Sequence, residues 1–426
     1  MEFAIKNKFK ILSAFTTSIL SLISLFLNFL LLIKINLKYS ISEQTDIYFF
    51  SLMISVFLSI SSQLLWEAMS KYYIQYQTKY NVKVSYLYSS LLNLNILLSV
   101  IIIIIYFVLS ESQLISSSLS HFMNVYIFYT FLQNIYIFNK YILNIKERYS
   151  LFYLFDIIIT SINLSAIYFI SFNNDILLLA YSSIIGTMGI VIYQFILIFH
   201  KYKTQYYFLF YVKSFKEVYI NSFNLKLGQV FYLSKDILLS IYIQNLNIVG
   251  LYTLYTYALK LVGLAYQTIQ IPIFNKYIVV LSKLLALKQY QQVNKLLYNK
   301  ILQTLLLVSA SLSVVYIFLP YILQILLSNI TEVQIATTRE IYIYISLVTL
   351  LYIIIVFTER VLSFSGYYRE VLKMGMFFFL LTILSYIFTS TKEVSYFLSL
   401  LIVFPNVIYA ISITKFYLKS DLRTHS

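Results

Sequence analysis

The sequence predicts an all-α, polytopic membrane protein with about twelve transmembrane helices in two six-helix lobes around a central cavity. Composition is the first reason: 60% of the 426 residues are hydrophobic and only 11% are charged, against roughly 25% charged in soluble domains. Long apolar runs separated by charged loops are the second reason. The third is a bias of basic residues toward alternate loops.

Twelve apolar runs are long enough to cross a bilayer, since about 20 residues span its hydrocarbon core. The first run is longer than the apolar region of a cleaved signal peptide, so we expect it to remain as a span. The seventh and eighth runs are the least regular because both contain charges. The predicted spans are 11–33, 45–66, 86–109, 122–143, 151–172, 176–199, 222–244, 248–274, 301–326, 338–364, 371–389 and 394–416.

Lysine and arginine are concentrated in alternate loops and in both tails, whereas the opposite loops hold Lys34, Lys38 and Lys392. Because basic loops stay on the cytoplasmic side of a membrane, both termini are expected in the cytoplasm. The net charge of +15 predicts anionic membrane lipids as partners. Nucleic acid is not expected, because the basic residues are spread singly over the loops.

The two halves of the chain align with each other. Tyr48, at the start of the second span, falls opposite Tyr252, at the start of the eighth, and Lys71 falls opposite Lys276. Two halves with equal numbers of spans in the same orientation form a parallel repeat, which is common in transporters. We therefore expect an N-terminal six-helix lobe over 1–217 and a C-terminal six-helix lobe over 218–426.

Three charged residues lie near the middle of predicted spans: Lys235, Asp236 and Lys260. A charge at the bilayer centre costs about 2.5 to 3.5 kcal/mol on insertion scales, so all three are candidate functional residues. An ion pair between Asp236 and one of the lysines is the structural alternative. Lys260 also lies on a polar helical face whose members are three and four residues apart. This face comprises Thr253, Thr256, Lys260, Gly263, Gln267 and Gln270.

Other charges lie near the ends of spans. Glu359 and Arg360, toward a cytoplasmic end, are expected to form a gate or an ion pair. Asp46 lies at the outer start of the second span, where it is either solvated at the interface or a further substrate contact. No catalytic residue, metal site or cofactor is predicted, because the chain has no cysteine, its three histidines lie in loops or the tail, and the phosphate-binding motif of ATPases is missing.

Three stretches resemble the multidrug/oligosaccharidyl-lipid/polysaccharide (MOP) exporter superfamily. The stretch 43–50 (EQTDIYFF) is similar to the TDAFF-type start of span 2 in lipid II and polysaccharide flippases. The stretch 254–261 (LYTYALKL) is similar to the YYADRL-type span 8 and places Lys260 at the family's cationic cavity position, with lysine replacing arginine. The stretch 360–366 (RVLSFSG) resembles the end of span 10.

This resemblance implies a flippase that moves an undecaprenyl-pyrophosphate-linked oligosaccharide, an O-antigen or capsule repeat unit, across the bacterial cytoplasmic membrane. It implies that Lys260 and Lys235 hold the pyrophosphate. Polar side chains would bind the sugars, and a proton or a sodium ion would be the coupling ion. The residues expected at the sugars are Gln267, Gln270 and Asn28.

Three alternative functions remain open. Lipid II flippases usually carry two further C-terminal spans and arginines in span 1, which this chain lacks. Cation-coupled multidrug exporters usually carry an acidic residue in their N-terminal spans. A membrane polysaccharide polymerase needs a large outer loop, and the longest outer loops predicted here are the short segments 110–121 and 327–337.

The predicted topology can be tested with single cysteines, because the chain has none of its own. We expect His121→Cys, in an outer loop, to react with a membrane-impermeant maleimide on intact cells. Lys288→Cys, in a cytoplasmic loop, should react only after the cells are permeabilised. Labelling of Lys288→Cys on intact cells would reverse the orientation.

Overall fold

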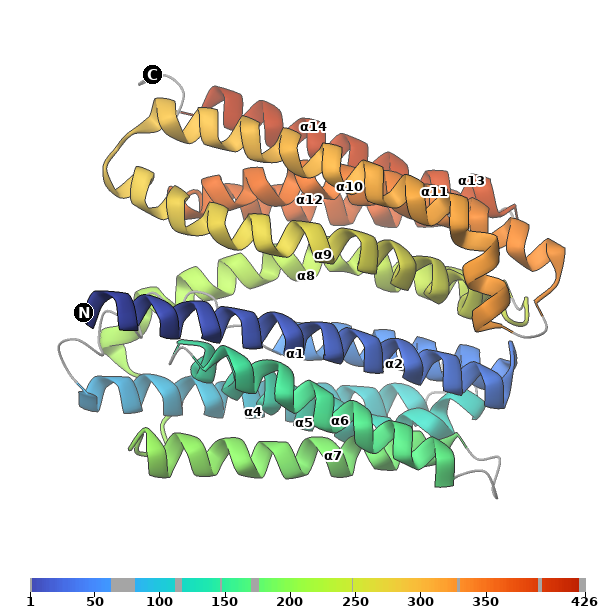
Figure 1. The fold of residues 1–426 in the computed structure, drawn as a ribbon, viewed down its shortest axis with the longest axis horizontal. Helices are drawn as coiled ribbons and strands as arrows, with labels where there is room; N and C mark the ends of the chain where they lie inside the picture. Colours follow the sequence, from blue (N-terminus) through green and yellow to red (C-terminus); the bar gives the residue numbers. More distant parts are fainter. Residues whose placement is uncertain are drawn as a thin grey trace. The chain divides into compact units, whose positions relative to one another are not determined.

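The computed structural model describes residues 2–62, 81–111, 117–145, 148–169, 176–246, 248–327, 330–389 and 393–420, which form helices and no strand. Each of the twelve predicted spans coincides with a helix, so the predicted fold class is confirmed (Figure 1). The last residues of the spans 45–66 and 151–172 lie outside the described ranges, as do Lys71 and Lys392.

The chain divides into two compact units. Unit 1 comprises residues 1–40 and 50–223, and unit 2 comprises 41–49 and 224–426. The helices of the first half are α1 (Glu2–Tyr39), α2 (Glu43–Ser62), α4 (Asn81–Glu111), α5 (Ser117–Ile145), α6 (Tyr149–Phe169) and α7 (Leu177–Ile196). Those of the second half are α8 (Lys216–Asn245), α9 (Leu251–Ala286), α10 (Tyr290–Leu326), α11 (Glu332–Phe364), α12 (Tyr368–Phe388), α13 (Val394–Leu398) and α14 (Phe404–Lys419).

Over the described residues, six helical segments are long and apolar enough to cross a membrane. They are Val84–Val108, Leu177–Lys201, Tyr290–Leu326, Glu332–Phe364, Tyr368–Phe388 and Tyr396–Lys419. Together the spans make this a multi-pass membrane protein.

In unit 1, α1 packs on α6, α6 on α7, and α5 on both α4 and α7. Most of the buried contact is apolar, but α5 and α6 also share a buried ion pair. Lys140 Nζ lies 2.7 Å from Asp156 Oδ2, and the hydroxyl of Tyr136 donates to Asp156 Oδ1 at 2.5 Å. Both oxygens of this carboxylate therefore have donors, which lowers the cost of a charge inside the unit.

A non-helical segment, 203–212, runs along α4 and is held there by a polar stripe. The backbone N–H of Gln205 donates to Ser85 Oγ at 3.1 Å, and that of Tyr207 donates to Ser89 Oγ at 3.0 Å. The serines of α4 thus accept from backbone N–H groups of this segment, which follows the apolar helix Leu177–Lys201 and makes no helical bonds of its own.

Asn93 continues this stripe one turn further along α4. Its amide Nδ2 donates to the carbonyl of Leu209 at 2.9 Å and to that of Tyr207 at 3.3 Å, while its Oδ1 accepts from the hydroxyl of Tyr206 at 2.6 Å. One asparagine thus bonds three groups of the segment. Outward from these bonds, the rings of Phe208 and Tyr211 are exposed.

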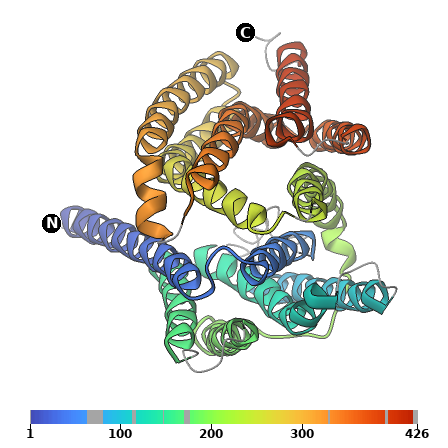
Figure 2. The ribbon, with the colours of Figure 1, turned by 90° about the vertical axis from the view of Figure 1, so that its right-hand side faces the viewer.

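In unit 2, α9 packs against both α10 and α11, and α14 packs against α11 and α12; Figure 2 shows the helices of the unit end on. The backbones of α8 and α12 approach closely at Gly228 and Gly375. A Cβ added to Gly375 would lie 2.9 Å from the carbonyl oxygen of Gly228. Larger residues at this crossing would separate the two helices, which is typical of small-residue contacts between membrane helices.

We predict that Asn93→Ala destabilises unit 1 by roughly 1 to 3 kcal/mol, because it removes the side-chain donor of the Leu209 carbonyl and the acceptor of the Tyr206 hydroxyl, both partly buried. The measurement is the midpoint of thermal unfolding of the purified protein in detergent, which should fall. Ser165→Ala is the control, since the exposed Ser165 hydroxyl bonds only the carbonyl of Ser161 in its own helix. Equal midpoints for the two variants would contradict this role for Asn93.

Candidate functional site

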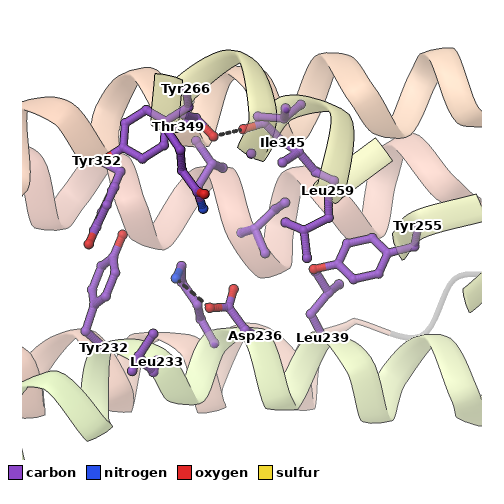
Figure 3. Close-up of a pocket in the computed structure, with 16 residues that line it drawn as sticks. Tyr232, Leu233, Asp236, Leu239, Tyr255, Leu259, Tyr266, Ile345, Thr349 and Tyr352 are labelled. Carbon is purple, nitrogen blue, oxygen red and sulfur yellow. Dashed lines mark hydrogen bonds and ion pairs between the residues drawn. The ribbon is translucent and has the colours of Figure 1, made fainter. Parts of the chain in front are cut away.

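Unit 2 contains a pocket of about 320 Å³ between α8, α9 and α11. From α8 it receives Tyr232, Lys235, Asp236 and Leu239, which are spaced three and four residues apart and therefore share one helical face. Figure 3 shows Tyr232, Asp236 and Leu239 rising from α8 toward residues of α9 and α11. The pocket is thus assembled inside one unit.

The charged part of the pocket is an ion pair between neighbours in sequence. Lys235 Nζ lies 3.1 Å from Asp236 Oδ2, and Lys235 is only 7% exposed. The same ammonium lies 4.1 Å from the centre of the Tyr232 ring. A buried lysine needs such compensation, and the carboxylate and the aromatic ring both provide it.

Aromatic rings form much of the rest of the wall. Tyr232 and Tyr352 stack with their ring centres 5.6 Å apart and an angle of 19° between their planes, and Figure 3 shows them reaching toward each other from facing helices. The hydroxyl of Tyr232 donates to Asn406 Oδ1 at 2.9 Å, which fixes the ring. Tyr255 and Tyr266 of α9 complete the aromatic lining.

The composition of the lining determines what the pocket can hold. Its volume lies at the lower end of the range for ligand sites, and it combines apolar walls with a small number of polar groups, as such sites do. Gln267 and Thr349 add hydrogen-bonding groups beside the ion pair. A polar or charged group of modest size, presented with an apolar or sugar-like face to the tyrosines, would suit this surface.

Lys260 lies on α9 with its side chain exposed and is not among the residues that line the pocket. The carboxylate of Asp236 pairs with Lys235 in the described part of the chain, so the ion pair considered for Asp236 forms with its neighbour in sequence. On the polar face of α9, Gln267 is exposed and contributes to the pocket, whereas Gln270 is buried. The structure therefore gathers Lys235, Asp236 and Gln267 at one place.

Asn28 lies in unit 1, on α1. Its Nδ2 donates to the carbonyl of Ser24 at 2.9 Å, and its Oδ1 accepts from the hydroxyl of Thr160 on α6 at 3.3 Å. The bond to Thr160 ties α1 to α6.

Glu359 and Arg360 lie near the end of α11. Glu359 Oε1 accepts from the hydroxyl of Tyr409 of α14 at 2.5 Å. The guanidinium of Arg360 lies 5.7 Å from the ring centres of both Phe274 and Phe364. Both residues thus make contacts within unit 2, with α14 and α9.

Asp46 caps the N-terminus of α9. Its Oδ2 accepts from the backbone N–H of Gly250 at 2.8 Å, and its Oδ1 accepts from the backbone N–H of Thr253 at 2.7 Å and from the Thr253 hydroxyl at 2.5 Å. The first N–H groups of a helix have no intrahelical acceptors, and a carboxylate there is favoured by the helix dipole. Gly250 is required beside it, because its φ is +83° and a Cβ would lie 2.1 Å from Ile41 Cγ2.

The tyrosines of the site could not be singled out from the sequence. Tyr232, Tyr255, Tyr266 and Tyr352 were indistinguishable from the other tyrosines of a chain that contains 43 of them. One signal was present: Tyr232 lies three residues before Lys235, which places both on the same face of α8.

We predict that Asp46→Ala destabilises unit 2 by roughly 1 to 2 kcal/mol, as the loss of a helix cap does, and that Asp46→Asn costs less because it keeps one acceptor. Thermal unfolding in detergent measures both effects. Glu370→Ala is the control, because in the described part of the chain the Glu370 carboxylate of α12 makes no such cap. An unfolding midpoint for Asp46→Ala equal to that of the control would exclude a stabilising cap.

No protein-family model matches this chain, and no curated protein is significantly similar to it in sequence. Solved structures, however, match it over almost its whole length. The lipid II flippase MurJ in an inward closed conformation superposes with a TM-score of 0.73 at 18% identity, covering 95% of this chain and 87% of that one.

Two multidrug transporters of the MATE family show the same similarity. An inward-facing MATE transporter of the MOP superfamily superposes with a TM-score of 0.73 at 14% identity, covering 95% of this chain and 96% of that one. The MATE multidrug transporter DinF-BH gives a TM-score of 0.66 at 15% identity, over 94% of this chain and 95% of that one. This chain therefore shares the fold of these solved structures, and the fold that the resemblance of its motifs implied is confirmed.

Proposed function

We propose that this protein is a flippase for an undecaprenyl-pyrophosphate-linked oligosaccharide, an O-antigen or capsule repeat unit, in the bacterial cytoplasmic membrane. Both termini would lie in the cytoplasm, and transport would proceed by alternating access between the lobes 1–217 and 218–426. The protein would act as a transporter and not as an enzyme. A proton or a sodium ion would supply the driving force.

The observation that carries this proposal is the pocket of unit 2, where a buried cation is combined with tyrosines and amide groups. A positive charge in the protein would offset the cost of removing the pyrophosphate from water. A lysine ammonium provides a point charge with three N–H donors. Sugar rings present hydroxyls and apolar faces, which Gln267 and the rings of Tyr232 and Tyr352 could bind. The exposed Lys260 of α9 would supply the second positive charge for the diphosphate.

Asp236 gives the pocket a way to change its charge during transport. While Asp236 pairs with Lys235, the two charges offset each other. A substrate phosphate would compete with the carboxylate for the ammonium, and protonation or a bound cation could release Asp236 from the pair. Protonation of Asp236, or a cation bound to it, would thereby change the affinity of Lys235 for the substrate phosphate.

Lipid II flipping and multidrug export are the two alternative functions that the experiments must distinguish from the proposed one. The similar solved structures include a lipid II flippase and multidrug transporters. Fold alone does not decide the substrate. A deletion strain that loses surface glycan supports the proposal, whereas one that becomes drug-sensitive with its glycan unchanged supports a multidrug exporter. Rescue of a strain depleted of its lipid II flippase would identify lipid II as the substrate.

The site is tested in a strain that lacks its own repeat-unit flippase. We expect Lys235→Ala and Lys260→Ala each to reduce export of surface glycan at least about tenfold, the effect of one lost charge-assisted bond. The arginine variants should retain much of the export. Lys415→Ala is the matched control, because Lys415 is exposed on α14, away from the pocket.

The double variant Lys235→Ala/Asp236→Ala separates binding from stability. If Lys235 only neutralises Asp236, removing both charges should restore export. If Lys235 binds substrate, export should stay low while the unfolding midpoint recovers. Normal export by both single alanine variants would exclude this pocket as the substrate site.

A further inference from the structure

A second hollow of unit 2, which has no part in the proposed transport site, lies between α10 and α11. It has a volume of about 290 Å³, and its lining is mostly aliphatic and aromatic, with serine hydroxyls between. Several of its walls are open to the surroundings: Ile317 is 64% exposed and Leu347 is 46% exposed. We call this hollow the α10–α11 groove. Its lining residues are Ser309, Leu312, Ser313, Tyr316, Ile317, Tyr342, Ile343, Ser346, Leu347 and Leu350.

The aromatic end of the groove is firmly built. The rings of Tyr316 and Tyr342 lie 6.2 Å apart, with an angle of 32° between their planes. The hydroxyl of Tyr342 donates to the carbonyl of Leu312 across the helix pair at 3.0 Å. These contacts join α10 to α11 beneath the groove and keep its floor in place.

Arg339 lies at the aromatic end of the groove, beside Tyr316. The guanidinium carbon of Arg339 lies 4.8 Å from the centre of the Tyr316 ring. Its Nε is buried and has no hydrogen-bond acceptor in the described part of the chain. Neither of the two ion pairs of the described residues includes Arg339, and the next residue, Glu340, points about 100° away around the helix. Neither of those ion pairs therefore competes with an external anion for this guanidinium.

The dimensions of the groove match one leaflet of a membrane. The lining of α11 runs from Tyr342 to Leu350, about 12 Å of helix, and Arg339 lies about one turn before it, which makes about 16 Å in all. One leaflet contributes about half of a hydrocarbon core that is about 30 Å thick. A hydrocarbon chain lying along the groove would therefore start at the interface beside Arg339 and end near the middle of the bilayer.

We propose that the α10–α11 groove binds an anionic phospholipid, with its phosphate on Arg339 and one acyl chain along the exposed aliphatic wall. Guanidinium groups bind phosphate oxygens through charge-assisted N–H bonds, and Arg339 belongs to neither ion pair of the described residues. A single acyl chain fits the length of one leaflet, whereas a polyprenyl chain would extend far beyond it. This site is independent of the proposed transport function.

Native mass spectrometry of the intact, delipidated protein tests the proposal, with dioleoyl phosphatidylglycerol and dioleoyl phosphatidylethanolamine as matched probes. We expect the wild-type protein to bind the first phosphatidylglycerol about tenfold more tightly than phosphatidylethanolamine. Arg339→Ala should abolish this preference, while Arg339→Lys should keep part of it. Ser313→Phe, which fills the groove and leaves Arg339 in place, should weaken the binding of both lipids.

Arg369→Ala is the control, because Arg369 is exposed on α12 and does not line the groove. Equal affinity of the wild-type protein for the two lipids would overturn the proposal, as would an unchanged preference in Arg339→Ala. Undecaprenyl phosphate is the third probe: displacement of phosphatidylglycerol by a tenfold lower concentration of it would assign the groove to the polyprenyl carrier and overturn the phospholipid assignment.

Discussion

The structure depends on one constraint: inside a membrane, every polar group must find its partner within the protein. Helices satisfy it for most of the backbone. Where a helix begins, at α9, the carboxylate of Asp46 accepts from its first free N–H groups. In the non-helical segment 203–212, which follows the span Leu177–Lys201, side chains of α4 bond the backbone, and Asn93 alone bonds three groups of that segment. In both places polar side chains satisfy backbone groups that no helix satisfies.

Each unit contains a lysine–aspartate ion pair among its described residues, and the two pairs differ in how many donors their carboxylates have. Lys140 and Lys235 each face an aspartate and lie over a tyrosine ring, at 5.2 Å and 4.1 Å from its centre. In unit 1 both oxygens of Asp156 have donors, from Lys140 and Tyr136. In unit 2 the pair borders a pocket, and among the described residues Lys235 is the ion-pair partner of its carboxylate. The first carboxylate is therefore satisfied by two donors, whereas the proposed function makes the second pair the place where a substrate anion would compete for the lysine.

The similarity to solved structures concerns the fold, and the same fold carries lipid and drug transporters. What distinguishes members of such a group is the chemistry of the cavity. Here a lysine, rather than a carboxylate alone, stands in a pocket with stacked tyrosines and an amide. The proposal of an anionic, sugar-bearing substrate rests on this combination, and such a substrate would have to displace Asp236 from Lys235.

Local composition was enough to predict the helical membrane fold, the positions of the spans and the residues whose charge required an explanation. Twenty apolar residues must form a helix in a bilayer, wherever the rest of the chain lies. The packing of the helices determines which charged side chains form ion pairs. Asp236 pairs with Lys235 and not with Lys260, and Tyr232, Tyr352 and Arg339 acquire their roles from neighbours on other helices. Helix rotation and packing fix those contacts, and periodicity within one span does not encode them.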